Sequence, residues 1–268
     1  MPHLKSIARK EPHRDDGGFP FNVASVRTLP VLRLSPAVTL FVGENGSGKS
    51  TVLEALAAAS GLPTVGAAES AADETLAAQR QLSQALRLTW RRRTHRGFFL
   101  RAEDFFGFQK RLVRQQQEMR EAIVRVDADY QGRSEWAKTL AKLPASGSLA
   151  DIARRYGEDP HARSHGEAFL DLFRGRFAPG GLYLLDEPEA ALSPQSQLGL
   201  LAMLLDMVKQ NAQFVIATHS PLLLAYPGAV IYSFDRTPVA RVAYDDLDHV
   251  RLTREFLQDP ERFLRQLG

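Results

Sequence analysis

Short, almost continuous apolar runs alternate along the chain with longer segments in which apolar residues recur at helical spacing. Four runs predict buried strands, because they are four to six residues long and end at polar residues or glycine: Val38–Val42, Leu182–Leu185, Gln213–Thr218 and Ala229–Phe234. Thr51–Ser60 and Ser196–Gln210 are rich in Ala or Leu and predict helices. Strands that alternate with helices favour a parallel sheet covered by helices, so the pattern predicts an α/β fold.

The remaining segments are less regular. Asn22–Leu34 alternates apolar and polar residues and predicts a pair of strands. Ala67–Leu88 is a helix candidate, and Phe105–Val126 carries apolar residues close to helical period, as in a long amphipathic helix that forms half of a helical hairpin. Gln131–Pro160 is polar and interrupted by Gly and Pro, which predicts loops and turns. Met1–Gly18 is charged and lacks an apolar run, so we expect a flexible tail there.

Length and composition fit an ordinary globular protein. The chain has 268 residues, of which 44% are hydrophobic and 24% charged. We expect one domain over residues 19–268, with an N-terminal β-portion and a helical subdomain inserted at about 65–165. The sequence has no Cys, which excludes a disulfide scaffold, a Cys-liganded zinc site and a thiol nucleophile. No secretory signal or membrane-spanning apolar stretch is visible, so we expect a cytoplasmic protein without membrane insertion.

The charge is distributed unevenly. Residues 79–126 contain twelve Arg or Lys against four Asp or Glu, whereas the whole chain has a net charge of only +3. A basic segment in an acidic remainder indicates a polyanionic partner such as nucleic acid, or a solvated helical surface. Within it, Arg91–Arg93 and Arg96 suit a phosphate backbone, and Trp90, Phe98 and Phe99 suit base stacking. The alternative, slightly favoured, is that these aromatic side chains belong to the core.

A glycine-rich loop joins the strand Val38–Val42 to the helix that begins at Thr51. Its sequence matches the pattern GxxxxGK[ST], in which glycines let the backbone N–H groups surround phosphate oxygens at a helix N-terminus. Lys49 can reach the β- and γ-phosphates of a nucleotide, and the hydroxyl of Ser50 can ligate Mg²⁺. The residues expected to bind ATP here are Gly43, Glu44, Asn45, Gly46, Ser47, Gly48, Lys49, Ser50 and Thr51.

Two acidic residues follow the strand Leu182–Leu185. An Asp at the carboxyl end of a buried strand lies where open α/β sheets bind ligands. We expect Asp186 to hold Mg²⁺, usually through water, and Glu187 to activate the attacking water. The alternative is an ordinary strand that ends in an acidic turn.

Five segments in this order resemble the ABC-type P-loop ATPases, in the soluble branch of SMC and RecF-like heads and of small stand-alone bacterial AAA-family proteins. They are GENGSGKST (43–51), FFLRAEDFF (98–106), SHGEAFL (164–170), LYLLDEPEAALSP (182–194) and IATHSPLLLA (216–225). The resemblance covers most of residues 38–235. It implies a P-loop NTPase fold, an ABC-ATPase-like head with a mixed sheet and an inserted helical subdomain.

The resemblance also implies roles for single residues. Ser164 and Gly166 match the signature motif, which in the family faces the nucleotide of a partner subunit, although the transporter sequence LSGGQ is absent. The segment SHGEAFL is equally a capped helix start. His219 matches the switch histidine that contacts the γ-phosphate. The family carries Gln where a strand leads into the helical subdomain, whereas FFLRAEDFF has none. Glu103 is the nearest candidate for that metal-side position, and a solvated acid is the alternative.

The function implied is hydrolysis of ATP to ADP and phosphate by a head that dimerises when it binds ATP, with Glu187, His219 and Lys49 as catalytic residues and Mg²⁺ as cofactor. Three uses stay open. They are nucleic-acid processing or phage defence, the energising subunit of an ABC transporter, and a nucleotide-sensing module that hydrolyses little and binds a protein partner. Phe21 and Arg27 are the candidates for contacting the adenine base.

Overall fold

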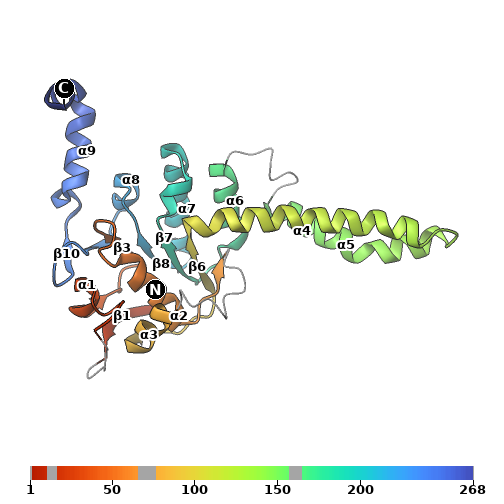
Figure 1. Ribbon diagram of the computed structural model, residues 1–268, viewed down its shortest axis with the longest axis horizontal. Coiled ribbons are helices and arrows are strands. Elements are labelled where there is room, and N and C mark those ends of the chain that lie inside the picture. Colours follow the sequence, from red (N-terminus) through yellow and green to blue (C-terminus); the bar gives the residue numbers. More distant parts are fainter. Residues whose placement is uncertain (1, 11–16, 66–76, 157–164, 268) are drawn as a thin grey trace.

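The protein, described here by a computed structural model, contains two β-sheets with helices on both sides (Figure 1). The structure describes residues 2–10, 17–65, 77–156 and 165–267. The larger sheet has the strand order β10-β9-β3-β8-β7-β6-β4. Its strands are β3 (Val38–Val42), β4 (Thr64–Val65), β6 (Gly97–Arg101), β7 (Leu182–Asp186), β8 (Gln213–Ala217), β9 (Val230–Ser233) and β10 (Ala240–Val242).

All neighbouring strands of this sheet run parallel except β10, which pairs antiparallel with β9. Every residue of β3, β7 and β8 is buried, which explains why these strands are continuous apolar runs in the sequence. The four strands predicted from those runs are confirmed, and so is the α/β class. The carboxyl ends of six parallel strands therefore lie at one edge of the sheet.

The smaller sheet has the antiparallel order β2-β1-β5, with β1 at Leu4–Arg9, β2 at Leu32–Arg33 and β5 at Leu86–Trp90. The expected tail over residues 1–18 is therefore wrong for residues 4–9, because Leu4 and Ile7 are fully buried. The expected strand pair in residues 22–34 is also wrong in part. That segment forms the short helix α1 (Ala24–Arg27) and only β2, which pairs with β1 instead of with a neighbour in its own segment.

Buried Gln213 joins the two sheets. Its Oε1 accepts hydrogen bonds from the backbone N–H groups of His3 and Leu4, each at 2.8 Å. Its Nε2 donates to the carbonyl oxygens of Leu4 at 2.8 Å and Leu34 at 2.6 Å. One side chain at the start of the central strand β8 therefore forms hydrogen bonds with four backbone groups that are not paired between strands.

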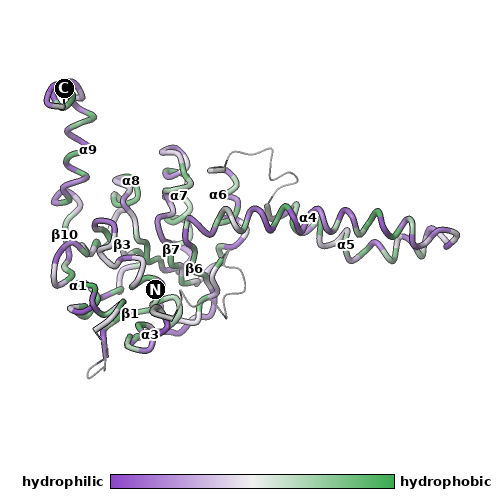
Figure 2. The backbone as a smooth tube through the Cα atoms, viewed as in Figure 1, coloured by the Kyte–Doolittle hydropathy of each residue, from purple (hydrophilic) through white to green (hydrophobic). Residues whose placement is uncertain are grey.

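Helices pack on both faces of the larger sheet and bury two separate clusters of apolar side chains. One cluster includes residues of α6 (His165–Arg176), α7 (Pro194–Lys209) and α8 (Pro221–Leu224). The other includes residues of α2 (Lys49–Ser60), α3 (Ala77–Ala85) and the smaller sheet. Successive residues of one strand face different clusters, as Leu184 and Leu185 do. Figure 2 colours much of β3 and β7 as hydrophobic, in keeping with burial on both faces.

Two long helices form an arm that projects from the body (Figure 1). α4 (Ala102–Asp129) packs against α5 (Glu135–Tyr156), so the predicted amphipathic helix and hairpin are confirmed. The expected insert at 65–165 begins too early, because β5 and β6 within it are sheet strands, and of the expected helix 67–88 only residues 77–85 are helical, with 66–76 outside the described residues. Gln131–Pro160 was expected to be loops, yet α5 continues through Pro144.

The chain ends in helices α9 (Asp248–Gln258) and α10 (Pro260–Leu267), which project from the body near β10 (Figure 1). Two short 3₁₀ segments, η3 (Pro188–Ala191) and η4 (Tyr244–Asp246), complete the elements. Over the described ranges, none of the helices combines the length and the apolar character that spanning a bilayer requires.

We predict that Gln213→Leu lowers the free energy of unfolding by on the order of 3–5 kcal/mol, because it leaves buried backbone donors and acceptors without partners. Urea unfolding followed by circular dichroism measures the loss. Gln210→Leu is the matched control, since Gln210 is exposed at the end of α7 and its side chain makes one long hydrogen bond among the described residues, 3.4 Å to the carbonyl of Asp206. Equal losses in the two variants would contradict the role given to Gln213.

Candidate functional site

The phosphate loop lies between β3 and α2, at the centre of the larger sheet. Gly48 has a φ of 99°, and a Cβ on it would lie 2.5 Å from Oγ of Ser25, so both the backbone conformation and the space require glycine. The hydroxyl of Ser25 donates to the carbonyl of Ser47. The short helix α1, which replaces the expected strand, therefore supports the loop from outside.

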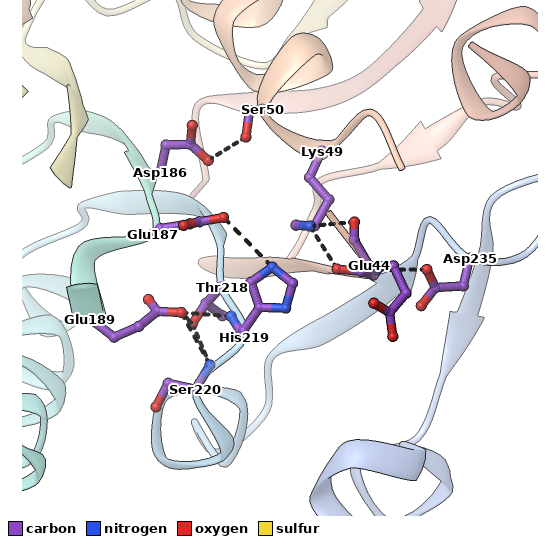
Figure 3. Close-up of polar contacts among 11 residues, drawn as sticks. Glu44, Lys49, Ser50, Asp186, Glu187, Glu189, Thr218, His219, Ser220 and Asp235 are labelled. Carbon is purple, nitrogen blue, oxygen red and sulfur yellow. Dashed lines mark hydrogen bonds and ion pairs between the residues drawn. The ribbon is translucent and has the colours of Figure 1, made fainter. Parts of the chain in front are cut away.

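Asp235 holds the other end of the loop. It follows β9, which pairs with β3, and its Oδ1 accepts the backbone N–H of Glu44 at 2.7 Å (Figure 3). This residue was not identified from the sequence, where it is one acid among several after a strand. Its position shows that the loop is fixed by the neighbouring strand end as well as by its own glycines.

Lys49 is almost completely buried, with 3% of its surface exposed. Its Nζ donates to the carbonyl oxygens of Gly43 at 2.6 Å and Glu44 at 3.0 Å, so the ammonium group points back into the loop (Figure 3). Burial lowers the pKa of Lys49, whereas the charges of Glu187 and Asp186 oppose that shift. A buried cation with only carbonyl partners in the loop is well placed to accept a phosphate.

Ser50 and Asp186 face each other across the gap between α2 and β7. The hydroxyl of Ser50 donates to Oδ1 of Asp186 at 3.0 Å. Burial raises the pKa of Asp186 to about 7, and the Ser50 hydrogen bond works against the shift. A hydroxyl and a carboxylate at this distance fit the oxygen ligands that Mg²⁺ prefers. In the part of the chain that the structure describes, no group of three His, Cys, Asp or Glu could hold a metal, so phosphate and water oxygens would have to complete the shell.

Glu103, the expected metal-side residue, lies in the first turn of α4. It lines a cavity of about 420 Å³ together with Ser50 and Asp186. However, its side chain is 76% exposed, and among the described residues it forms one long ion pair, 3.5 Å to Nη1 of Arg101. The structure therefore brings Glu103 to the edge of the candidate site, whereas Arg101 lies deeper in it.

Glu187 has a left-handed backbone conformation, with φ 48° and ψ 48°. Its N–H donates to the carbonyl of Ala217 at 2.9 Å, which ties the end of β7 to the end of β8. Its Oε1 lies 3.6 Å from Nε2 of His219 (Figure 3). Such backbone conformations cost free energy for a residue with a side chain and persist where the surrounding structure holds them, as it does at this strand end.

Glu189 holds the segment that carries His219. Its Oε1 accepts hydrogen bonds from the hydroxyl of Thr218 at 2.7 Å and from the N–H groups of His219 at 2.6 Å and Ser220 at 3.1 Å (Figure 3). The sequence analysis missed this residue, because an acid two positions after Glu187 has no distinctive spacing. A single carboxylate oxygen thus links the acidic turn after β7 to the turn after β8.

Gly166 lies in the first turn of α6, beside the turn after β7. A Cβ on Gly166 would lie 3.0 Å from Oγ of Ser196 and 3.7 Å from the carbonyl oxygen of Ala191. Ser193 caps α7, accepting the N–H of Ser196 at 3.2 Å. The start of α6 and residues 191–196 are therefore neighbours. Ser164 lies outside the described residues.

Two further sequence hypotheses concern aromatic and basic side chains. Phe98 and Phe99 are buried in the two apolar clusters, so base stacking on them is wrong and the core alternative is confirmed. Phe21 is also buried, with the guanidinium of Arg9 5.3 Å from its ring centroid, whereas Arg27 is exposed. Of the two adenine candidates, only Arg27 presents its side chain to solvent.

Lys49, Ser50, Asp186, Glu187 and His219 thus lie at neighbouring strand ends of one sheet edge (Figure 3). Gly166 lies beside Ser196. Parallel strands in the order β3-β8-β7 bring together residues that are far apart in the sequence. Their chemical roles stay predictions.

Comparisons with known proteins agree with this arrangement. Residues 21–135 match the family described as "AAA domain", and residues 168–225 match the one described as "AAA domain, putative AbiEii toxin, Type IV TA system". No curated protein matches the chain. A nucleotide-free ATP-binding cassette from an ABC transporter is similar over 97% of both chains, at 16% identity and a TM-score of 0.45.

A second similar structure is the Smc head domain with an extended coiled coil from Pyrococcus furiosus. It has 12% identity and a TM-score of 0.42, with 96% of this chain and 100% of that chain covered. The two AAA-domain matches include the phosphate loop, the acidic turn after β7 and the turn that carries His219. Over these two segments, the chain is similar to AAA-domain families.

Proposed function

We propose that the protein binds ATP with Mg²⁺ and hydrolyses it to ADP and phosphate. The observation that supports this most is the convergence of Lys49, Ser50, Asp186, Glu187 and His219 at the carboxyl edge of three adjacent parallel strands. Together they contribute a buried cation, a hydroxyl, a buried carboxylate, a half-exposed carboxylate and an imidazole.

Binding would use the loop and the residues that surround it. Lys49 would exchange the carbonyl oxygens of Gly43 and Glu44 for phosphate oxygens, a stronger charge-assisted interaction. Ser50 and Asp186 would hold Mg²⁺, which when bound neutralises part of the phosphate charge. The loop amides, fixed by Asp235 and Ser25, need little rearrangement to bind an anion.

Hydrolysis would begin with a water molecule beside Glu187. Its oxygen forms a bond to the γ-phosphorus while the bond from that phosphorus to the β–γ bridging oxygen breaks. The water proton passes to the carboxylate of Glu187, whose side chain is 42% exposed and so accessible to water. His219, 3.6 Å from that carboxylate, would contact the transferring phosphate.

Dimerisation driven by ATP is the second part of the proposal. In the resemblance, the segment that contains Ser164 and Gly166 faces the nucleotide of a partner. Gly166 lies beside Ala191 and Ser196, so the start of α6 is close to the turn that follows the acidic residues of β7. In a closed two-fold dimer, the phosphate loop of each chain would face the segment with Ser164 and Gly166 of the other chain.

Among the uses of such a cycle, nucleic-acid processing or phage defence is favoured by the basic segment 79–126, part of which lies on the projecting helix α4. One matched family is described as including a toxin of a toxin–antitoxin system, which is compatible with a defence role. A transporter subunit and a nucleotide sensor remain the alternatives. Turnover measured with and without DNA, and co-purification with a membrane protein, would separate the three.

We predict that Glu187→Gln keeps ATP affinity within about threefold of wild type and lowers kcat by roughly 10²–10⁴-fold, because only the proton acceptor is lost. Phosphate release and binding of a fluorescent ATP analogue measure the two quantities. Glu255→Gln, on α9, is the control and should match wild type. Wild-type turnover by Glu187→Gln would refute the role assigned to Glu187.

Glu189→Ala should lower kcat by roughly 10-fold or more at nearly unchanged ATP affinity, because the His219 turn loses three hydrogen bonds to one oxygen. Glu189→Gln retains an acceptor oxygen and should recover much of the activity. Steady-state kinetics on both variants, with melting temperatures, test this. A loss of ATP affinity that parallels the loss of kcat would contradict a positioning role toward His219.

We predict that Glu187→Gln is monomeric or weakly associated without nucleotide and dimeric with Mg-ATP, since a ligand that contacts both chains must stabilise the dimer. Ser164→Arg in the same background should abolish the change and leave ATP binding largely intact. Light scattering measures the mass. A mass that does not respond to saturating ATP would exclude the dimer for the isolated chain.

A further inference from the structure

A partly buried arginine, Arg101, faces the candidate metal and phosphate site. Arg101 is the last residue of β6 and pairs with Asp186 in the register of β6 and β7. It lines the cavity of about 420 Å³ together with Ser50, Glu54, Asp186 and Glu187. Among the described residues that line this cavity it is the only one with a positive charge, while four of them are carboxylates.

Glu54 of α2 holds the guanidinium. Its Oε1 lies 2.6 Å from Nη2 of Arg101, and the two side chains are only 12% and 21% exposed. Nη1 reaches exposed Glu103 at 3.5 Å, and Nε is buried without a hydrogen-bond partner among the residues described. The guanidinium is therefore oriented by one strong ion pair and still has donors to offer.

The guanidinium of Arg101 is therefore placed to bind a second anion, one that carries more charge than the carboxylate of Glu54. A guanidinium binds phosphate with two parallel hydrogen bonds, and a triphosphate carries more charge than one carboxylate. Glu54 lies one turn of α2 after Ser50, and Arg101 lies across the ladder from Asp186, so the pair borders the place where the outermost phosphate of a loop-bound nucleotide would lie.

We propose that Arg101 contacts the γ-phosphate of a nucleotide bound at this site. Until a nucleoside triphosphate binds, the guanidinium stays in its ion pair with Glu54. The inference rests on the proposed nucleotide binding. It makes Arg101 the residue that distinguishes ATP from ADP, because a diphosphate leaves no terminal phosphate on that side of the loop and the ion pair with Glu54 then stays intact.

Equilibrium binding of ATP and ADP to the full chain, with Mg²⁺ and with hydrolysis blocked by Glu187→Gln, tests the proposal. Arg101→Gln should weaken ATP binding by about 10-fold or more and leave ADP binding within about twofold, since one charge-assisted contact is removed. Arg101→Lys should recover part of the wild-type preference for ATP over ADP. Arg96→Gln, at the other end of β6, is the matched control and should keep the wild-type ratio.

Glu54→Gln should change the preference for ATP over ADP in the opposite direction. It should raise the preference for ATP over ADP severalfold, because the guanidinium no longer has to leave a carboxylate. In the double variant with Arg101→Gln that gain should vanish, because it acts through Arg101. Melting temperatures report whether each variant folds.

The outcomes separate the two proposals. A parent protein that binds neither nucleotide overturns the proposed function itself. A parent that binds both, with the same ATP-to-ADP ratio in Arg101→Gln, overturns only the role of Arg101. A gain in Glu54→Gln that persists in the double variant also overturns it.

Discussion

Four carboxylates lie along the edge of the larger sheet, of which only Asp235 is exposed, and each is held by a donor from a different element. Asp186 is bound by the hydroxyl of Ser50, Asp235 by the N–H of Glu44, and Glu189 by the turn that carries His219. Glu54 is bound by Arg101. Because a buried carboxylate without a partner is costly, these contacts fix the phosphate loop, the helix α2 and the strand ends relative to one another.

Two charged groups at this edge support the proposed binding of a magnesium–nucleotide complex. Burial raises the pKa of Asp186 and lowers that of Lys49, so each group is held in surroundings that disfavour its charged form. A magnesium–nucleotide complex would supply the missing counter-charge to both. The site is therefore better matched to its proposed ligand than to water.

The central sheet and much of the candidate site were predictable from sequence because strands buried on both faces are continuous apolar runs, and because the phosphate loop has a fixed spacing. β1 was not predictable in this way, since LKSIAR mixes charged and apolar residues and becomes a strand through pairing with β2 and β5. Glu189 and Arg101 were missed because their significance comes from long-range contacts. The same holds for Gln213, which looks like an ordinary polar residue at the start of a strand.

The arm has a geometric consequence that follows from where it is attached. α4 begins directly after Arg101, at the edge that carries the cavity, and contains 28 residues. A helix of that length spans about 42 Å, so a tilt of about 5° at its base displaces its far end by roughly 4 Å. The hairpin partner α5 stiffens it along most of its length. A small tilt at the root of the arm would therefore displace its free end much farther than the side chains at its root.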